Sequence, residues 1–336
     1  MIFDCDIAIV GGGPAGSAAA IWSAVRGLDA ILIESEAFPR HRPGESLHPG
    51  VEPLLQQLQV LDAVSSAGFR RYAGHWVTWA GKTAFQPFGG GLERAWLGFQ
   101  ATRSEFDAIL LNRAKSLGVR VLQPARAGDA LYRAGRIAGV RCNGTEIRSR
   151  FVIDASGRRQ WLQRQIGLCV RRFSPPLIAA WGYGRGVLPH WGDHPRLTGH
   201  GNGWSWMAPI QDDLFSWTRL DFGCPILTPP WPASQLEPVG RTKAADVTWR
   251  LVPPSSGDGF FVTGDAASVM DPAASHGVLK ALMSGVLAAD LAARVKAGVI
   301  DQSNASDAFR GWTRKWFLSD VRRLRNRYAD LRPAPL

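Results

Sequence analysis

Cysteine, lysine and long apolar runs are all scarce in this sequence of 336 residues. The four cysteines, Cys5, Cys142, Cys169 and Cys224, stand singly, without CxxC spacing and without clustering with histidine. This pattern excludes a disulfide framework and a zinc site, so we expect no bound metal. It fits the reducing cytoplasm, where we expect the protein to work.

No stretch reaches the roughly 20 consecutive apolar residues that cross a bilayer. The apolar segment from Ile7 to Ala20 is interrupted by glycines and preceded by Asp4 and Asp6, unlike a secretory leader. We therefore expect a buried strand and helix there, and no membrane span.

Acidic charge is also in short supply. The chain has 39 basic and 28 acidic residues, a net charge of +11, and only six of the basic residues are lysines. Because there is no basic tail and no finger motif, we do not expect nucleic acid as a partner. An anionic cofactor and an acidic partner account for the excess better.

What the sequence does contain is the pattern of a Rossmann-type α/β fold. An apolar strand over residues 5–10 leads through a glycine-rich turn into a helix over 17–26 and a second strand ending at Glu34. Such a βαβ unit binds dinucleotides. Further buried strands over 151–154 and 259–264 return the chain to the same domain.

The segments between these strands have a different character. Alternating apolar residues, glycines, prolines and many tryptophans indicate antiparallel sheet. We therefore predict a nucleotide-binding domain of residues 1–72, 101–174 and 255–300, an inserted antiparallel-sheet substrate domain of residues 73–100 and 175–254, and a C-terminal helical segment of residues 301–336.

The glycine turn GGGPAG has the residues that a dinucleotide pyrophosphate requires. Gly11 permits the tight turn, Gly13 lets the pyrophosphate approach the backbone, and Gly16 allows close packing of helix on strand. Glu34 ends the second strand about 20 residues on, where a carboxylate holds the ribose hydroxyls. These residues predict a dinucleotide site without distinguishing FAD from NAD.

Later motifs make that distinction through a resemblance. The segments TRSEFD at 102–107, VIDASGR at 152–158, VTGDAA at 262–267, and DP and SHGV within 271–278 follow in order. Together they resemble the FAD-binding superfamily of aromatic hydroxylases, geranylgeranyl-type reductases and flavin-dependent halogenases. The resemblance implies FAD, reduced by NAD(P)H or by a separate flavin reductase.

The resemblance also implies roles for particular residues. Asp265 contacts the ribityl or pyrophosphate part of FAD, and the helix after Pro272 points its N-terminus at the flavin, where a positive helix end stabilises the anionic reduced ring. Two residues separate Asp154 from Gly157, unlike the hydroxylase form, which argues against a direct role of Asp154 with NADPH. The predicted cofactor-binding residues are Gly11, Gly13, Pro14, Ala15, Gly16, Glu34, Ser35, Arg42, Ser46, Arg103, Ala125, Asp154, Ser156, Gly157, Gly264, Asp265, Pro272, Gly277 and Val278.

Two further segments resemble signatures of tryptophan-halogenase-like proteins. GESLHP at 44–49 resembles Gly-Glu-Ser-x-x-Pro, and GWSWMAP at 203–209 resembles Trp-x-Trp-x-x-Pro. The first is also a plausible helix cap, and tryptophans at strand spacing are as often core as site wall. The candidate catalytic residues are His48 and His276, for proton handling, and Trp204 and Trp206.

The chemistry is harder to assign than the cofactor. A halogenase passes hypohalous acid to a lysine, which the resemblance places just before Gly-Glu-Ser, where this chain has Arg42 and Pro43. Arginine stays protonated because its pKa exceeds about 12, and we expect Lys82 to be exposed in a turn. We therefore predict a monooxygenase that hydroxylates an electron-rich indole or phenol, with halogenation, double-bond reduction and a non-catalytic flavin-binding role as alternatives.

The partner follows from a narrower resemblance. The runs PGESLHPG at 43–50 and SHGVLKALMSG at 275–285 resemble the maturation flavoproteins of quinone-cofactor amine and amino-acid oxidases, which oxygenate a tryptophan of a partner protein. With the basic charge, this implies an aromatic substrate within an acidic peptide or protein. A free indole or phenol in an enclosed pocket is the alternative. The oligomeric state is not predicted.

Overall fold

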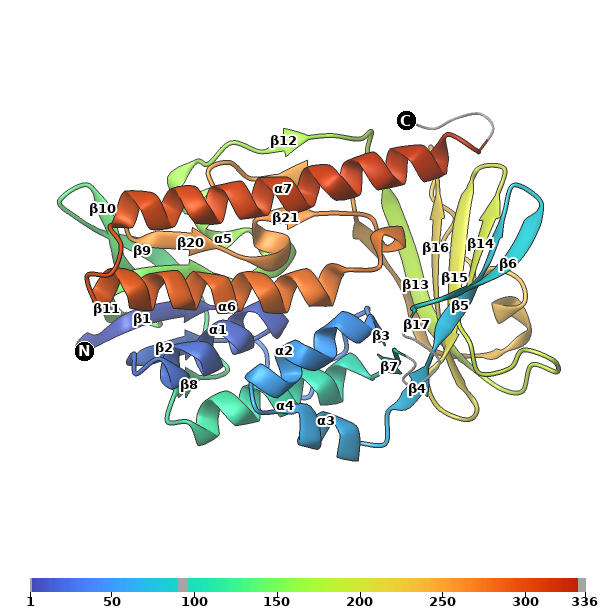
Figure 1. Cartoon of the computed structure of the whole chain (residues 1–336), viewed down its shortest axis with the longest axis horizontal. Helices are drawn as coiled ribbons and strands as arrows, with labels where there is room; N and C mark the ends of the chain where they lie inside the picture. The colour runs from blue at the N-terminus through green and yellow to red at the C-terminus, as the bar shows by residue number, and fades with distance from the viewer. Residues whose placement is uncertain (1, 90–95, 332–336) are drawn as a thin grey trace.

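The computed structural model describes residues 2–89 and 96–331, which form two sheets side by side with long helices along the first (Figure 1). Residues 90–95 and 332–336 of the predicted domain segments lie outside the described residues.

The first sheet has a parallel core of short, buried strands. β1 (Ile2–Val10) pairs in parallel with β2 (Ala30–Ile33) and β11 (Thr145–Asp154), and β8 (Arg120–Leu122) and β20 (Phe260–Val262) extend the sheet on either side. The carboxyl ends of these strands meet at one edge, where parallel α/β sheets bind ligands. Antiparallel strands complete the sheet: β9 (Ala127–Arg133), β10 (Arg136–Cys142) and β19 (Ser256–Gly257).

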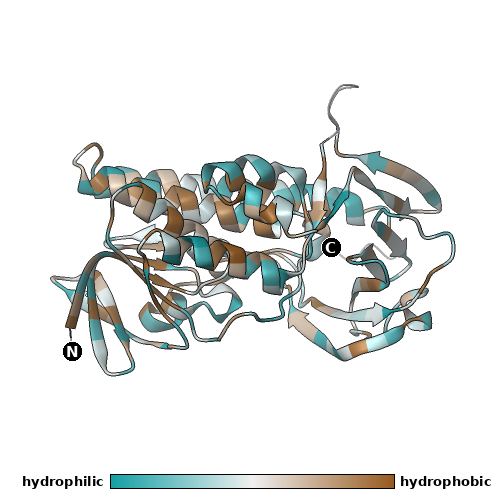
Figure 2. Ribbon diagram, turned by 90° about the horizontal axis from the view of Figure 1, so that it is seen from below, coloured by the Kyte–Doolittle hydropathy of each residue, from teal (hydrophilic) through white to brown (hydrophobic). Residues whose placement is uncertain are grey.

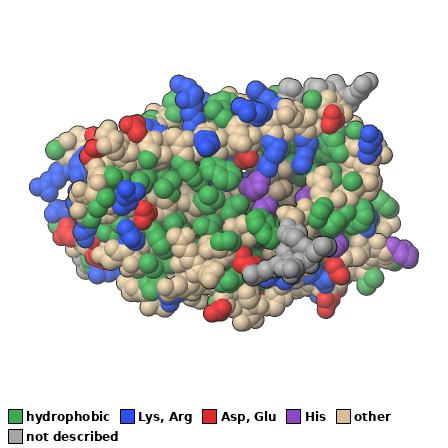
Figure 3. Space-filling model, in the orientation of Figure 1, with side chains coloured by type: hydrophobic (Ala, Val, Ile, Leu, Met, Phe, Trp, Pro, Cys, Tyr) green, Lys and Arg blue, Asp and Glu red, His purple; other side chains and the backbone are tan. Residues whose placement is uncertain are grey.

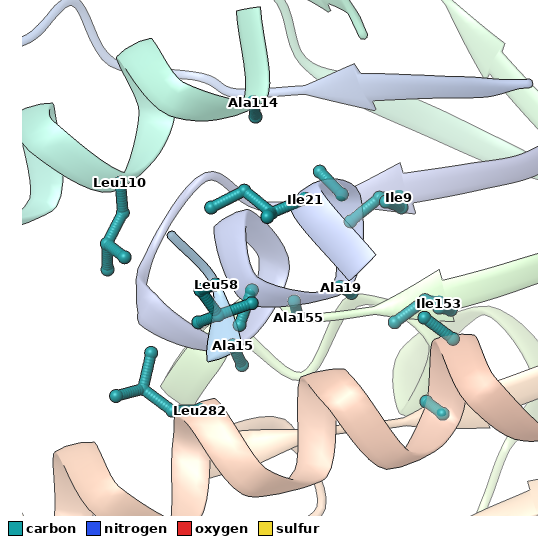
Figure 4. Close-up of a cluster of buried hydrophobic side chains, with 14 of the residues drawn as sticks. Ile9, Ala15, Ala19, Ile21, Leu58, Leu110, Ala114, Ile153, Ala155 and Leu282 are labelled. Carbon is teal, nitrogen blue, oxygen red and sulfur yellow. The ribbon is translucent and has the colours of Figure 1, made fainter. Parts of the chain in front are cut away.

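Helices cover one face of this sheet, with α1 (Pro14–Val25) packed directly between the strands and α6 (Gly277–Lys296). Small residues make the approach of α1 and α6 possible, because a Cβ on Gly285 would lie 2.1 Å from the carbonyl oxygen of Ala15. Figure 4 shows side chains of α1, α6 and α4 (Arg103–Ser116) meeting those of the strands. The other face is covered by the β9–β10 hairpin and α5 (Trp161–Ile166).

The second sheet has seven strands in the order β17-β13-β16-β15-β14-β5-β6. Neighbours are antiparallel except for β14 and β5, which pair in parallel. Alternation therefore turns one side of each strand toward the interior. The strands are β5 (Gly74–Trp79), β6 (Lys82–Pro87), β13 (Ile178–Arg185), β14 (Arg196–His200), β15 (Gly203–Pro209), β16 (Leu214–Asp221) and β17 (Glu237–Asp246).

Helix α7 (Gln302–Tyr328) connects the two sheets. It begins at Asp301, whose carboxylate accepts a hydrogen bond from the Asn304 amide, and it runs beside α6 toward the second sheet (Figure 1). Near its end, Phe317 and Leu324 pack in one buried cluster with tryptophans of the second sheet. The C-terminal segment is thus part of the core of both regions.

Shorter elements join the sheets. Between residues 52 and 66 the chain forms two separate helices, α2 (Glu52–Gln57) and α3 (Leu61–Ser66), because Gln59 between them takes a φ of 56°. The remaining strands are β3 (Ser46–Leu47), β4 (Arg70–Tyr72), β7 (Gly98–Gln100), β12 (Arg171–Arg172), β18 (Arg250–Leu251) and β21 (Ser268–Val269), and the 3-10 turns are η1 (Pro49–Val51), η2 (Gly157–Arg159), η3 (Ala233–Gln235), η4 (Gly264–Ala266) and η5 (Pro272–Ala274).

This architecture agrees with the predicted α/β fold carrying an antiparallel-sheet insertion, whereas the domain boundaries stay a prediction. Apolar and polar residues alternate along the helices (Figure 2). Over residues 2–89 and 96–331, none of the helices has both the length and the apolar character needed to cross a membrane.

Candidate functional site

A cavity of about 1010 Å³ extends from the carboxyl edge of the parallel strands to the inner side of the second sheet. Figure 3 shows this face hollowed near its centre, with histidine side chains in the hollow and basic side chains along its upper rim. The cavity therefore joins the predicted nucleotide site to the tryptophan-rich region.

The glycine turn forms the first wall of the cavity. Gly11 has a φ of 106°, which favours glycine, and α1 begins after Gly13 without a side-chain cap, so its first amides stay free for a ligand. Gly11, Gly13, Pro14 and Ala15 line the cavity. Gly16 does not, since it lies in the packing: a Cβ there would come within 1.8 Å of the Gly11 carbonyl oxygen.

Glu34 fixes this turn. Its carboxylate accepts hydrogen bonds from the amides of Gly12 (2.7 Å) and Glu36 (2.8 Å) and lines the cavity, leaving lone pairs for ribose hydroxyls. The backbone of Ala125 donates to the Glu34 carbonyl oxygen at 2.7 Å. Ser35 and Ala125 also line the cavity, so three of the predicted residues lie together at the end of β2.

Arg40 lies deeper in the cavity than the predicted Arg42. Its terminal nitrogen Nη2 lies 3.6 Å from a carboxylate oxygen of Glu34 and 3.8 Å from one of Asp107. The same nitrogen is the nearest atom to a Cβ built on Gly13. Arg42 also lines the cavity but pairs with Glu36 nearer the surface. Arg40 was overlooked, although it stands in the same segment; its burial beside the glycine turn distinguishes it.

Arg103 joins α4 to the segment before β3. It forms a two-pronged ion pair with Asp107 (2.9 and 3.0 Å) and donates to the Pro43 carbonyl oxygen at 2.8 Å. Ser46 donates to the Gln100 side-chain oxygen at 2.8 Å. Arg103 and Ser46, both predicted to bind the cofactor, line the cavity.

The end of β20 and the amino end of α6 form the far side of this region. Asp265 is exposed at the cavity, and the Gly264 amide donates to the Ser284 hydroxyl at 3.0 Å. Helix α6 begins at Gly277 without a side-chain cap, so its positive end opens on the cavity. Pro272, Gly277 and Val278 line the cavity as well.

The predicted contact of Asp154 with the cofactor is corrected. Its buried carboxylate accepts hydrogen bonds from the amides of Ser156 (2.9 Å) and Leu162 (2.8 Å), and it does not line the cavity. Asp154 instead fixes the turn that presents Ser156 and Gly157, which do line it.

An aromatic wall closes the other end of the cavity; it consists of Tyr72, His75, Phe88, Trp181, Trp204 and Trp206. Trp204 has no exposed surface, and its indole donates to the Tyr328 hydroxyl at 2.9 Å, so it belongs to the core as much as to the wall. Trp206 is only half-buried.

His75 was missed by the sequence-based prediction. Its ring centroid lies 5.5 Å from that of Trp206, and its buried Nδ1 has no hydrogen-bond partner among the described residues. Burial lowers the pKa of His75 to about 4, with the Arg327 and His48 charges acting in the same direction. Alternation along β5, which sets His75 on the side of the buried Val77, was the available signal.

The two predicted histidines lie against each other, with ring centroids 5.2 Å apart. His48 lines the cavity, and its Nδ1 accepts a hydrogen bond from the Gly50 amide at 3.0 Å, so the proton sits on Nε2. Burial and the Arg323 charge lower the pKa of His48, which favours a neutral donor. His276 packs behind it and does not line the cavity, which corrects its prediction as a directly acting residue.

Two further polar side chains of the cavity were missed. Glu45 is buried and accepts hydrogen bonds from the Tyr183 hydroxyl and the Gly44 amide; burial raises its pKa. Lys280 lines the cavity one turn into α6, with Nζ 2.7 Å from Asp320. The lysine discussed from the sequence was Lys82, which is exposed at the start of β6 as expected.

The residues present fit FAD. A glycine cradle without side chains, two uncapped helix amino ends and Arg40 face one continuous space, as a diphosphate and a reduced flavin require. Over the same described ranges, no group of three or more histidine, cysteine or acidic side chains is arranged to hold a metal ion.

The sequence and fold resemble those of known proteins. A family model described as tryptophan halogenase matches residues 6–100 and 90–216. The tryptophan 2-halogenase of Chondromyces crocatus is 30% identical over 93% of this chain and 66% of its own length. The 1H-pyrrole-2-carbonyl-(peptidyl-carrier protein) brominase of Pseudoalteromonas luteoviolacea is 29% identical over 92% of this chain and 82% of its own length. The myxobacterial chondrochloren halogenase superposes with a TM-score of 0.87 at 24% identity, covering 97% of this chain and 83% of that one.

These similarities confirm the predicted superfamily, its Rossmann-type fold and an FAD-dependent oxidoreductase. They favour halogenation, which the sequence analysis kept as an alternative, over hydroxylation, its main prediction. The chain spans about two thirds of the length of the tryptophan 2-halogenase.

Proposed function

Because the chain belongs to the tryptophan halogenase family, we propose that it halogenates an electron-rich aromatic ring, using reduced FAD, oxygen and halide. One observation carries the proposal: the dinucleotide cradle, Lys280 and the aromatic wall line the same cavity.

In this proposal, the free amides after Gly13 and the Arg40 guanidinium would hold the diphosphate of FAD, and Glu34 would hold a ribose. Asp265 and the amino end of α6 would hold the ribityl and flavin parts. Once reduced by NAD(P)H or by a separate reductase, FAD would supply the electrons with which oxygen oxidises halide to hypohalous acid.

The chain's own residues then position the reaction. Trp206 and His75 hold the aromatic ring by stacking and edge contacts and keep water out. The Lys280 Nζ, held by Asp320 at 2.7 Å, donates a proton to the oxygen of hypohalous acid, so that this oxygen leaves as water when the ring attacks the halogen. The buried Glu45 carboxylate accepts the proton that the ring then loses.

Hydroxylation of the same ring is the second candidate. It is favoured by Arg42, which stands before Gly44-Glu45-Ser46 where the resemblance places a lysine. Incubation with FAD, NADH, a flavin reductase, bromide and indole, phenol or pyrrole separates the two by product mass. A brominated ring supports the proposal, and a ring that gains only oxygen supports the second candidate.

The role of Lys280 is tested in the same assay. We expect Lys280→Met to lower bromination by two or more orders of magnitude while FAD binding stays within twofold of the wild-type value. Lys82→Met removes an exposed lysine far from the cavity wall and is the matched control. Equal bromination by Lys280→Met and Lys82→Met would assign the reaction to other residues.

The substrate in this proposal is carried by a protein. Arg126, Arg158 and Arg164 are exposed residues that line the cavity, and they form no ion pair with an acidic residue in the described ranges. The brominase of Pseudoalteromonas luteoviolacea is named for a pyrrole on a carrier protein. We expect pyrrole-2-carboxylate bound as a thioester to a carrier protein to react at least tenfold faster than free pyrrole-2-carboxylic acid. A higher reaction rate for the free acid would favour a small-molecule substrate.

A further inference from the structure

The loop that leads into α6 is held from outside by α7. Arg327 donates to the Ala273 carbonyl oxygen at 3.3 Å, and the Tyr328 hydroxyl donates to the Asp271 carboxylate. One terminal nitrogen of Arg323 lies 2.5 Å from the Ala274 carbonyl oxygen. Residues 271–276 therefore form much of their polar contact with α7, which follows about 50 residues later in the sequence.

The contacts form one face of α7. Asp320, Arg323 and Arg327 have helical spacings of three and four, so their side chains project to the same side, and Tyr328 borders that side. Asp320 adds the ion pair with Lys280. This side of α7 therefore contacts both the loop of residues 271–276 and the first turn of α6.

The terminal nitrogen of Arg323 also lies 2.8 Å from Nδ1 of His276. A guanidinium group can only donate, so Nδ1 accepts and the proton of the neutral imidazole sits on Nε2. His276 in turn packs on His48, which lines the cavity.

We propose that Arg323 is a positioning residue of the cavity, which fixes the loop at the amino end of α6 through Ala274 and holds the His276 imidazole in one tautomer behind His48. The inference rests on the placement of FAD at this helix end in the proposed function, but not on halogenation. Arg323 itself does not line the cavity.

The charge of Arg323 has a second consequence. His276 faces Arg323 and Asp320 from α7, Lys280 from α6, and His48. Burial and then the Arg323 charge lower the pKa of His276, and the Asp320 charge opposes them. Without the guanidinium, the pKa of His276 rises toward its ordinary value and the imidazole is free to rotate away from His48.

The test uses Arg323→Met, the conservative Arg323→Lys, and Arg322→Met as a matched control. Arg322 is the exposed neighbour on the same helix, and it forms no hydrogen bond or ion pair with any described residue. The Arg323 side chain is 46% exposed, so we expect all three variants to fold, as a thermal unfolding scan will check.

The first measurement follows the His276 imidazole by NMR as pH is varied, without added FAD, with the signal assigned through His276→Gln. We expect its pKa to rise in Arg323→Met, to return toward the wild-type value in Arg323→Lys, and to stay unchanged in Arg322→Met. The second measurement is FAD affinity by fluorescence titration. We expect Kd to rise about tenfold in Arg323→Met at pH 7, which is about 1.4 kcal/mol, and further below the new pKa.

An unchanged His276 titration in Arg323→Met, or an FAD affinity equal to that of Arg322→Met, overturns the inference. Neither measurement depends on the product formed. If the protein binds FAD and shows the expected shifts but forms no halogenated ring, the inference stands and the proposed function fails.

Discussion

The two ends of the cavity are built differently. At the dinucleotide end the groups that face the cavity are backbone amides, helix ends and glycines such as Gly13, whose missing side chain leaves space beside the backbone. At the aromatic end they are side chains, such as His75 and Trp206, that project from a sheet. The backbone shape of the first end admits few residue types, because side chains would fill the space, whereas the second end is shaped by its side chains.

The strongest test of this contrast is Gly16→Ala. A single added carbon would lie 1.8 Å from the Gly11 carbonyl oxygen, which forces the turn and α1 apart. We expect a loss of stability of about 1–3 kcal/mol or more and no measurable FAD binding, by urea unfolding and fluorescence titration. Gly311→Ala, on the exposed side of α7 and not among the residues that line the cavity, is the control, because nothing lies within 4 Å of its added Cβ. Similar losses in both variants would contradict the packing argument.

Tyr328→Phe tests the polar core that joins both ends. The substitution keeps the ring but removes the donor to Asp271 and the acceptor for the Trp204 indole. Leaving buried polar groups unsatisfied costs about 1–3 kcal/mol each, so we expect a clear fall in the free energy of unfolding. Tyr132→Phe, at a side chain that is 57% exposed, should leave it unchanged. A stable Tyr328→Phe would mean that the core relaxes around the missing hydroxyl.

Trp206→Ala should affect the substrate more than the fold. Its ring is half-buried against His75 at the cavity, whereas Trp204 is fully buried. We expect KM for the aromatic substrate to rise about tenfold, as the loss of an aromatic contact implies, with FAD affinity within twofold. Trp204→Phe should lower stability instead. If both variants changed only stability, the aromatic wall would be core alone.

The smallest expected effect is on the pH dependence of stability. The pKa of His75 is lowered by burial to about 4 in the folded protein, while the unfolded chain binds a proton below its ordinary value of 6.5. Unfolding therefore takes up a proton between these values, and stability falls as pH falls through this range. Burial raises the pKa of Asp271 to about 6, which makes stability rise as pH falls. This effect is the same in the wild-type protein and in a His75 variant, so it cancels when the two are compared.

We expect His75→Gln to remove roughly one proton from the uptake on unfolding near pH 5, measured from the slope of the free energy of unfolding against pH. His190→Gln, at an exposed histidine, is the control and should keep the wild-type slope. An unchanged slope in His75→Gln would show that His75 titrates in the folded protein as it does in the unfolded chain.

The sequence by itself determined the dinucleotide end. Gly11, Gly13 and Glu34 form a local pattern, because the turn and the two strands beside it are close in the chain and each position admits few residues. The fold class followed from the same local periodicity. The prediction that Arg42 replaces a needed lysine used sequence position alone, and it led to hydroxylation as the main prediction.

Only the tertiary structure decided the rest. Lys280 faces the cavity because α7 supplies Asp320 beside it, and Arg40 reaches the glycine turn because its segment folds back over α1. His276 lies behind His48 rather than on the cavity, and Asp154 turns toward Leu162. Each of these depends on contacts between segments far apart in the chain, and residue periodicity specifies which side of an element is buried but not which distant side chain it meets.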